Sequence, residues 1–370
     1  MSNISIPFVD LSRQFRSLET ELLEAFIEVG RSGVYILGDK LDSFEEKVSK
    51  YCGVKHALGV ANGSDALFLI LKSLGIGPGD EVITAANSFI ATAWVIVAVG
   101  ARPILVDVAS DLNISPSKVA EAITDRTKAI IPVHLTGRPA EMDEINEIAL
   151  QKGLYVIEDA AQAIGARYRN RSVGSLGTAG GFSLHPLKNL GVLGDGGFVT
   201  TNDTKVFEKL KLLRNHGLVN RDECEIWGYN SRLDSLNAYF AEIKLRKLDQ
   251  WNERCREIAE LYRAGIQEYV DVPKDQQYAE CVYHNYVIRT EKRDLLMQYL
   301  NGKGISTKIH YPIPIHLQKA ASNLGYKEGD FPNTELYAKT MMSLPIYPEL
   351  SNEEVDYVIL NIINFFRGIN

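Results

Sequence analysis

Lys188 is the residue of this sequence with the most specific chemical surroundings. It lies in residues 181–189, GFSLHPLKN, and a glycine-rich run, GVLGDGG, follows over residues 191–197. A lone lysine in a loop is usually a solvated charge, but this one follows a strand-like run, and glycines let the backbone approach a bound group closely. A lysine with a lowered pKa can attack a carbonyl to form a Schiff base, and the same amine, once released, can move a proton. These surroundings predict that Lys188 anchors a carbonyl cofactor and shuttles protons.

Asp159 and Gln162 follow a second strand-like run, residues 154–157, LYVI. Their spacing fits a helix capping box. It also fits an aspartate that keeps a pyridine nitrogen protonated beside a glutamine that reaches a ring hydroxyl. Ser183, just before Lys188, is placed to donate its hydroxyl to a phosphate. Together with Lys188 these residues favour the second interpretation, a site for pyridoxal 5′-phosphate.

Residues 61–65, ANGSD, join a strand-like run to a helical pattern. Free backbone N–H groups and the helix dipole at such a junction can hold a phosphate. Gly63 and Ser64 are therefore candidates for the phosphate site, and the alternative is that Ser64 caps its helix.

The chain pattern places these segments at one edge of a sheet. From about residue 56 to 202, short β-rich runs alternate with longer helical patterns, which is typical of a parallel sheet with helices on both faces. In such sheets the functional loops follow the carboxyl ends of the strands. After Asp234 the pattern changes to a long charged helical stretch over residues 236–269. We expect a cofactor-binding domain over residues 1–250 and a smaller domain over residues 251–370.

Composition excludes several classes of protein. The 370 residues include 40 basic and 47 acidic ones, a net charge of −7 that predicts neither a nucleic acid nor a membrane partner. The four cysteines are far apart and no histidine cluster accompanies them, so we expect no metal site and no disulfide framework. The N-terminus lacks the pattern of a signal peptide, and the longest apolar run is too short to span a bilayer. We expect a soluble, cytoplasmic protein.

Several segments, in order along almost the whole chain, resemble the DegT/DnrJ/EryC1/StrS family of nucleotide-sugar aminotransferases. The most specific are EDAAQAIGA, FSLHPLKNLGVLGDGG, NSRLD and HYPIPIHLQ. The resemblance implies the fold of type I pyridoxal-phosphate enzymes, an α/β architecture in which helices flank a mostly parallel mixed sheet, with a smaller α+β C-terminal domain. It also implies a homodimer whose subunits share their active sites.

The resemblance implies a role for each matching residue. Lys188 corresponds to the lysine that binds the cofactor, Asp159 to the partner of the pyridine nitrogen and Gln162 to the contact with the ring hydroxyl. The other implied cofactor contacts are Gly63, Ser64 and Ser183 at the phosphate, Phe89 on the ring face, and Asn230 at the phosphate of the neighbouring subunit's cofactor. Phe89 has a core phenylalanine as its alternative.

The substrate-binding residues are less sharply implied. Candidates are Tyr35, His310, Tyr311 and His316, each with a structural role as the alternative. His134 is expected to be a packed strand-end residue and His185 to line the site without acid/base work. Thr136 and Arg138 depart from the family's common pattern, VHLYGQ, so substrate contacts do not transfer in detail.

The segment HYPIPIHLQ is more similar to the corresponding segment of family members that aminate C3 of a sugar than to that of members that aminate C4. It implies a nucleotide-linked 3-keto sugar as acceptor, L-glutamate as donor, and a product for surface glycans such as O-antigen and lipopolysaccharide, or for antibiotic sugars. The alternatives are a C4 aminotransferase, a dehydratase of the same family with histidine at the anchoring position, and a non-catalytic regulatory homologue. A nicotinamide-dependent oxidoreductase is disfavoured because Asn62 to Asp65 replace the expected glycine fingerprint.

Overall fold

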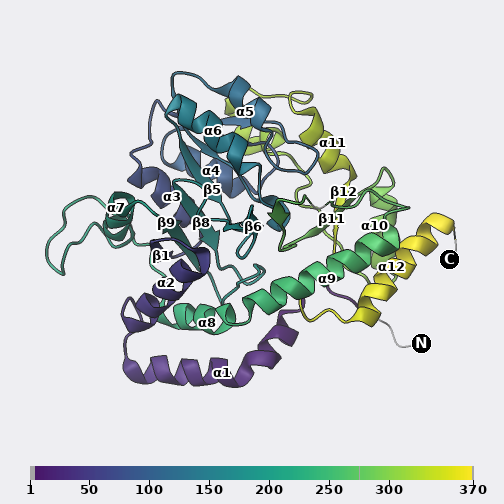
Figure 1. Cartoon of the computed structure of the whole chain (residues 1–370), viewed down its shortest axis with the longest axis horizontal. Coiled ribbons are helices and arrows are strands. Elements are labelled where there is room, and N and C mark those ends of the chain that lie inside the picture. Colours follow the sequence, from purple (N-terminus) through teal and green to yellow (C-terminus); the bar gives the residue numbers. More distant parts are fainter. Residues whose placement is uncertain (1–4, 275, 369–370) are drawn as a thin grey trace.

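The computed structural model describes residues 5–274 and 276–368, which fold around a central seven-stranded sheet (Figure 1). All strands except β9 run in one direction, and β9 is antiparallel to both of its neighbours. This confirms the predicted mostly parallel mixed sheet. In spatial order the strands are β1 (His56–Val60), β9 (Gly197–Thr201), β8 (Ala179–Ser183), β5 (Tyr155–Asp159), β4 (Thr127–Ile131), β2 (Glu81–Ala85) and β3 (Arg102–Val106).

Both faces of the sheet are buried under helices. In β4, Ala129 and Ile131 belong to one hydrophobic cluster and Ile130 to the other, because successive side chains of a strand point to opposite faces. The first face is covered by α3 (Gly63–Ser73), α4 (Ile90–Ala98) and α7 (Thr204–Arg214). The second is covered by α2 (Asp39–Cys52), α5 (Pro116–Ala122), α6 (Met142–Lys152) and α8 (Ser235–Leu245). With both faces occupied, a site on this sheet must be built from the loops at the strand ends.

The C-terminal part forms a separate hydrophobic cluster, which also takes in Ile6 from the N-terminal segment. Its elements are α9 (Leu248–Ile266), α10 (Arg293–Gly302), α12 (Asn352–Arg367) and the antiparallel pair β11 (Tyr286–Arg289) and β12 (Met341–Leu344). The domain boundary near residue 250 stays a prediction. The remaining elements are α1 (Leu11–Ser32), α11 (Pro332–Thr340), β6 (Arg167–Tyr168), β7 (Arg171–Ser172), β10 (Ala279–Glu280) and the 3-10 turns η1 (Leu135–Gly137), η2 (Ile315–Leu317) and η3 (Lys319–Leu324).

The long charged helical stretch expected over residues 236–269 is divided into α8 and α9, with the break at Arg246 and Lys247. Ala238 and Ala241 of α8 belong to the cluster on the second face of the sheet, as does Leu248 at the start of α9, whereas Ile258 and other apolar residues further along α9 pack in the C-terminal cluster. Most of α9 thus packs in a different core from α8, and the chain turns between the two helices (Figure 1). Helical periodicity continues on both sides of the break and does not reveal it.

Among residues 5–274 and 276–368, no helix has the length and apolarity required to cross a bilayer.

A buried glutamate organises the end of the central strand β5. Glu158 is fully buried, and its carboxylate accepts hydrogen bonds of 2.7 Å from the backbone amides of Gly174, Leu176 and Gly177. The same carboxylate lies 3.0 Å from Nε2 of His134, whose Nδ1 accepts a hydrogen bond from the amide of Ala140. Since Nδ1 is an acceptor, Nε2 carries the proton and donates a hydrogen bond to the Glu158 carboxylate. His134 is thus the packed strand-end histidine that was predicted.

Substitution of Glu158 tests this arrangement. Glu158→Ala removes the acceptor of two buried amides, one partly buried amide and one buried histidine, and a buried donor costs free energy when left without a partner. We expect the free energy of unfolding to fall by about 3 kcal/mol or more, as measured by chemical denaturation. The control is Glu121→Ala on the exposed surface of α5, which should change stability by less than about 0.5 kcal/mol. Equal unfolding midpoints for the two variants would contradict the role given to Glu158.

Candidate active site

A cavity of about 660 Å³ lies at the edge of the sheet where β1, β2, β5 and β8 end. Each of these strands leads into a segment that contributes side chains to the cavity wall, as expected for loops at the carboxyl ends of parallel strands. The structure brings together most of the residues predicted from the sequence. Those that line the cavity are Gly63, Ser64, Phe89, Asp159, Gln162, Ser183, Lys188, His310 and Tyr311.

Lys188 is half-buried in this cavity, in the loop after β8, where its backbone amide donates to the carbonyl of His185 at 2.8 Å. Burial lowers the pKa of Lys188 to about 8, and the nearby carboxylate of Asp159 opposes that shift. A fraction of the side chain is therefore a neutral amine at neutral pH. This is the state that can attack a carbonyl.

Asp159 is held in place by a chain of hydroxyl groups. Thr92 donates to the Asp159 carboxylate at 2.7 Å, and the Thr92 oxygen lies 2.8 Å from the hydroxyl of Ser88. Because the single proton of Thr92 goes to the carboxylate, Ser88 is the donor to Thr92. Burial raises the pKa of Asp159, and the hydrogen bonds from Thr92 and the Ala161 amide oppose this rise. A buried carboxylate of this kind gains from a positively charged partner in the cavity.

The capping-box interpretation of Asp159 and Gln162 is wrong, because residues 160–165 form turns rather than a helix. Gln162 instead links two loops. Its carbonyl oxygen accepts from the amide of Thr136 at 2.7 Å and its amide nitrogen donates to the Tyr311 hydroxyl at 3.2 Å. The Tyr311 ring centroid lies 5.7 Å from that of Phe89. Phe89 is 53% exposed and lines the cavity, so the alternative of a core phenylalanine is wrong as well.

The start of α3 has the geometry of a phosphate site. Gly63 and Ser64 are its first two residues, and the N-cap is Asn62, whose side chain accepts from the amide of Asp65 at 2.8 Å. Ser64 is therefore not the helix cap, and the first amides of the helix remain available to an anion. Gly63 lies against Ser183 so closely that a Cβ on residue 63 would be 2.7 Å from the Ser183 Cβ. The two predicted phosphate contacts are thus adjacent.

Several residues of the cavity were not found from the sequence. They are Ser88, Thr92, Trp94, Asp195 and His284. Thr92 carried a signal, since it stands four residues after Ser88 at the start of a helix that follows a strand. His284 had none, because it comes from the C-terminal part of the chain and reaches the cavity through tertiary packing.

The imidazole rings of His284 and His310 and the phenol of Tyr311 stay uncharged at neutral pH. Burial and, secondarily, the charge of Lys188 lower the pKa of His310 to about 4 and that of His284 well below its ordinary value. Burial also raises the pKa of Tyr311 to about 12. Of Lys188, His310 and Tyr311, the lysine has the pKa closest to neutrality, which suits it for proton transfer.

Three predicted residues lie outside this cavity. His316 is 3% exposed, and its Nε2 lies 3.0 Å from the Glu335 carboxylate, so this geometry offers no support for a substrate contact. Tyr35 is 57% exposed and donates to the carbonyl of Gly30 at 3.3 Å. Asn230 forms a bridge with Asn215 in the segment that follows α7. The roles of Tyr35 and Asn230 stay predictions.

Comparison with known proteins identifies the family to which this chain belongs. The model of the DegT/DnrJ/EryC1/StrS aminotransferase family matches residues 16–363. The chain belongs to this family. Its members include dTDP-3-amino-3,6-dideoxy-alpha-D-galactopyranose transaminase of Aneurinibacillus thermoaerophilus, to which this aminotransferase is 47% identical over 96% of this chain and 98% of the relative. The pleiotropic regulatory protein of Geobacillus stearothermophilus is 45% identical over 98% of this chain and 99% of its own length.

Solved structures of similar proteins confirm the fold and the cofactor. The X-ray structure of S. venezuelae DesV in complex with a ketimine intermediate has a TM-score of 0.96 and 42% identity, with 98% of each chain covered. The structure of NtdA from Bacillus subtilis with bound cofactor PMP has a TM-score of 0.92 and 32% identity, over 98% of this chain and 85% of the other. The protein is a sugar aminotransferase that uses pyridoxal phosphate. The open helix terminus at Gly63, the buried Asp159 and the lowered pKa of Lys188 all fit that cofactor.

The contact between Gly63 and Ser183 predicts the effect of a single added methyl group. Gly63→Ala places a Cβ against Ser183 and pushes the helix terminus away from the phosphate. We expect pyridoxal phosphate to bind at least about tenfold more weakly, which corresponds to about 1.4 kcal/mol. Titration of the cofactor-free protein with pyridoxal phosphate measures this change. Gly302→Ala is the control, since a Cβ there meets open space; equal affinities in the two variants would argue against a phosphate at Gly63.

The pKa of Lys188 predicts its reactivity in the cofactor-free protein. Because the pKa is lowered to about 8, the neutral amine is half populated near pH 8, and its reactivity rises with pH through that midpoint and levels off above it. Brief acetylation at a series of pH values, followed by mass spectrometry of the peptide that contains Lys188, measures this titration. In Asp159→Asn the midpoint should move to lower pH, because the carboxylate that stabilises the ammonium is gone. A midpoint near pH 10.5, where an exposed lysine titrates, would show that burial does not act on Lys188.

Proposed function

We propose that this aminotransferase transfers an amino group from L-glutamate to C3 of a nucleotide-linked 3-keto sugar. The observation that carries the proposal is one cavity that Lys188, Asp159, Gln162 and Ser183 line together with the exposed ring of Phe89. The Aneurinibacillus thermoaerophilus relative is named as a transaminase of a 3-amino sugar, which supports the C3 position. The HYPIPIHLQ segment supports it too, because it resembles that of family members that aminate C3, and its residues His310 and Tyr311 line the same cavity.

Each residue has a distinct task in this proposal. When bound, pyridoxal phosphate supplies an electron-withdrawing ring that stabilises negative charge on the carbon next to the nitrogen. Asp159, supported by Thr92, holds a proton on the ring nitrogen. Gln162 orients the ring through its hydroxyl, and Gly63, Ser64 and Ser183 hold the phosphate. The Lys188 amine binds the cofactor and then, once free, takes a proton from one carbon and returns it to another.

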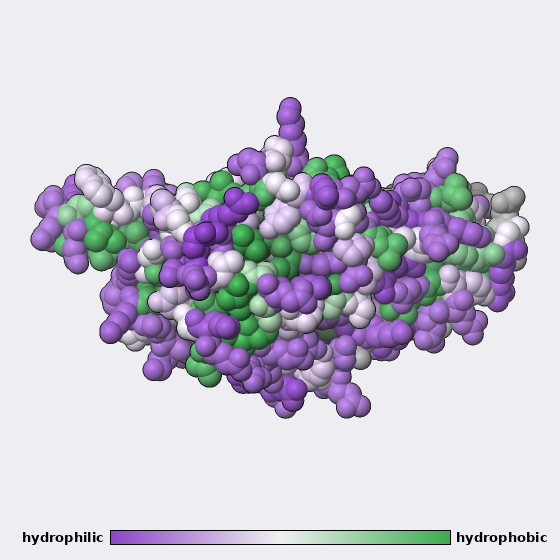
Figure 2. All heavy atoms as spheres, turned by 90° about the horizontal axis from the view of Figure 1, so that it is seen from above, coloured by the Kyte–Doolittle hydropathy of each residue, from purple (hydrophilic) through white to green (hydrophobic). Residues whose placement is uncertain are grey.

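We also propose that the active protein is a homodimer. Hydrophobic side chains are exposed on α1, at Leu23, Phe26 and Ile27, and Trp227 on the segment after α7 is 95% exposed. Figure 2, seen from above Figure 1, shows hydrophobic side chains on the projecting end that carries this segment, whereas α1 lies on the opposite side, at the bottom of Figure 1. Exposed apolar patches of this kind mark interaction surfaces. Tyr35 and Asn230, which lie outside the cavity of their own chain, would then reach the cavity of the partner.

The proposed product is an amino sugar for surface glycans, such as O-antigen or lipopolysaccharide, or for antibiotics. The resemblance of this chain to the DegT/DnrJ/EryC1/StrS family supports this product.

An absorbance and product assay tests the function. The purified protein with pyridoxal phosphate should show a visible band of lysine-bound cofactor, which L-glutamate discharges as the amino group moves to the cofactor. Loaded with amino group, the protein should then convert an NDP-3-keto-6-deoxyhexose or a UDP-3-keto-N-acetylhexosamine to the 3-amino sugar, detected by mass spectrometry. Lys188→Ala should abolish the band and the turnover while the protein stays folded.

Two outcomes would change the proposal. Preferential turnover of the matching 4-keto sugar would replace C3 with C4, which is the alternative activity. Formation of the band without any response to L-glutamate would exclude this donor, and release of water from the sugar in place of amination would indicate the dehydratase.

A further inference from the structure

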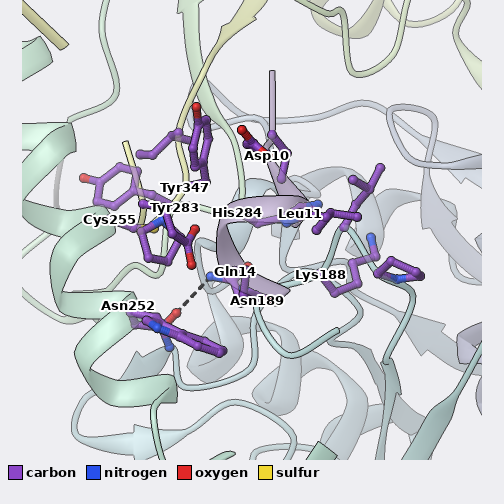
Figure 3. Close-up of a pocket in the computed structure, with 17 residues that line it drawn as sticks. Asp10, Leu11, Gln14, Lys188, Asn189, Asn252, Cys255, Tyr283, His284 and Tyr347 are labelled. Carbon is purple, nitrogen blue, oxygen red and sulfur yellow. Dashed lines mark hydrogen bonds between the residues drawn. The ribbon is translucent and has the colours of Figure 1, made fainter. Parts of the chain in front are cut away.

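The loop that carries Lys188 borders open space on more than one side. A second cavity adjoins the first, and Leu187, Lys188 and His284 line both of them. Figure 3 shows this second cavity, with Asp10, Leu11 and Gln14 of the N-terminal segment beside the loop. Because residues 187 and 188 line two cavities, they are not enclosed by core side chains on all sides. Polar contacts of the neighbouring residues then help to fix the position of Lys188.

One such contact comes from the residue next to Lys188. The side-chain nitrogen of Asn189 donates to the Asn252 side chain at 2.9 Å, the dashed line in Figure 3, and to the carbonyl of Val282 at 3.1 Å. Asn252 in turn donates to the carbonyl of Ile164 at 3.1 Å. This chain of amides ties the lysine loop to α9 and to the turn after β5.

The second contact is a buried ammonium group. Lys244, in the last turn of α8, is 5% exposed, and its Nζ donates to the Gly191 carbonyl at 2.7 Å and to the Gln14 side-chain oxygen at 2.9 Å. Burial lowers the pKa of Lys244 to about 8, and the charge of Glu349 opposes that shift. A lysine is rarely this buried unless its ammonium makes specific contacts.

The Gly191 carbonyl is well placed to transmit this contact to Lys188. Gly191 lies so close to the preceding turn that a Cβ would be 2.5 Å from the Pro186 oxygen and 2.9 Å from the His185 oxygen. Val192 continues the turn, and its amide donates to the Leu184 carbonyl at 2.8 Å. A shift of Gly191 toward this turn therefore displaces residues 185 and 186. These residues lie two and three positions before Lys188 in the chain, so Lys188 moves with them.

We propose that Lys244 is a positioning residue for Lys188: its ammonium, shared between Gly191 and Gln14, clamps the glycine-rich loop from α8 and α1. The proposal rests on the proposed role of Lys188 in catalysis, but the clamp itself is a property of the protein without cofactor. Removal of the ammonium leaves the buried Gly191 carbonyl without its donor and lets the loop relax toward the adjoining cavity. A displacement of the reactive amine by about 1 Å is sufficient to slow an enzyme substantially.

Hydrogen exchange of the cofactor-free protein tests the clamp directly. In Lys244→Met, which keeps the length of the side chain, we expect the peptide over residues 184–196 to exchange at least about tenfold faster, while β1 and β9 keep their protection. The matched control is Lys247→Met, an exposed lysine three positions further along, which should leave exchange unchanged. Unchanged exchange of residues 184–196 in Lys244→Met would overturn the proposal. Faster exchange over the whole sheet would overturn it too, because it would make Lys244 a general stabiliser.

Two further measurements secure the interpretation. If Lys244→Met does not fold, Gln14→Leu removes the other acceptor of the ammonium; faster exchange confined to residues 184–196 supports the clamp and unchanged exchange overturns it.

In the enzyme loaded with pyridoxal phosphate, Lys244→Met should lower kcat about tenfold or more with a change of less than about twofold in KM for L-glutamate. The reason is that Lys188 is misplaced while the binding of L-glutamate is unaffected. If the wild-type protein shows no band with pyridoxal phosphate, the proposed function fails, while the exchange experiment still decides the clamp.

Discussion

The burial of a carboxylate and an amine in one cavity is the constraint on which this active site depends. Burial raises the pKa of Asp159 and lowers that of Lys188, so each group is driven toward its neutral form, while each charge favours the other. The balance leaves a lysine that titrates near pH 8 beside a carboxylate supported by Thr92. A cofactor with a cationic ring and a carbonyl matches both groups, because it offers a charge to the aspartate and an electrophile to the lysine.

The parallel sheet makes this juxtaposition possible. Asp159 ends β5 and Ser183 ends the neighbouring strand β8, so the loops that follow them begin side by side. The alternation of β5 places Glu158 on the opposite side from Asp159, where it anchors the turn at residues 174–177 and His134. One strand end therefore carries a structural carboxylate and a carboxylate that lines the cavity as consecutive residues, with environments set by opposite faces of the sheet.

The loop that carries Lys188 combines a backbone held by hydrogen bonds with a lysine side chain that faces a cavity. Its flanking residues are fixed by side chains from distant elements, Asn252 on α9 and Lys244 on α8, whereas the lysine itself faces open space. Restraint is thus applied to the backbone on either side of the reactive amine. The side chain of Lys188 itself faces the cavity, while the backbone around it is held.

The local pattern of the sequence was sufficient for the alternating strands and helices, for Lys188, Asp159, Gln162 and Ser183 as one constellation, and for the family. The strands and helices follow from periodicity, and the constellation from residue types placed after strand-like runs, which one chain displays by itself. The family followed from the resemblance of whole motifs such as EDAAQAIGA and FSLHPLKNLGVLGDGG. The tertiary structure alone decided what depends on contacts between distant segments. It broke the helical stretch at Arg246 and Lys247, made Asn62 rather than Ser64 the cap of α3, and brought Thr92, His284 and Lys244 to the site or its loop. It also placed His316 against Glu335, away from the cavity. Burial and hydrogen-bond partners arise when elements pack together, and spacing along the chain does not encode them.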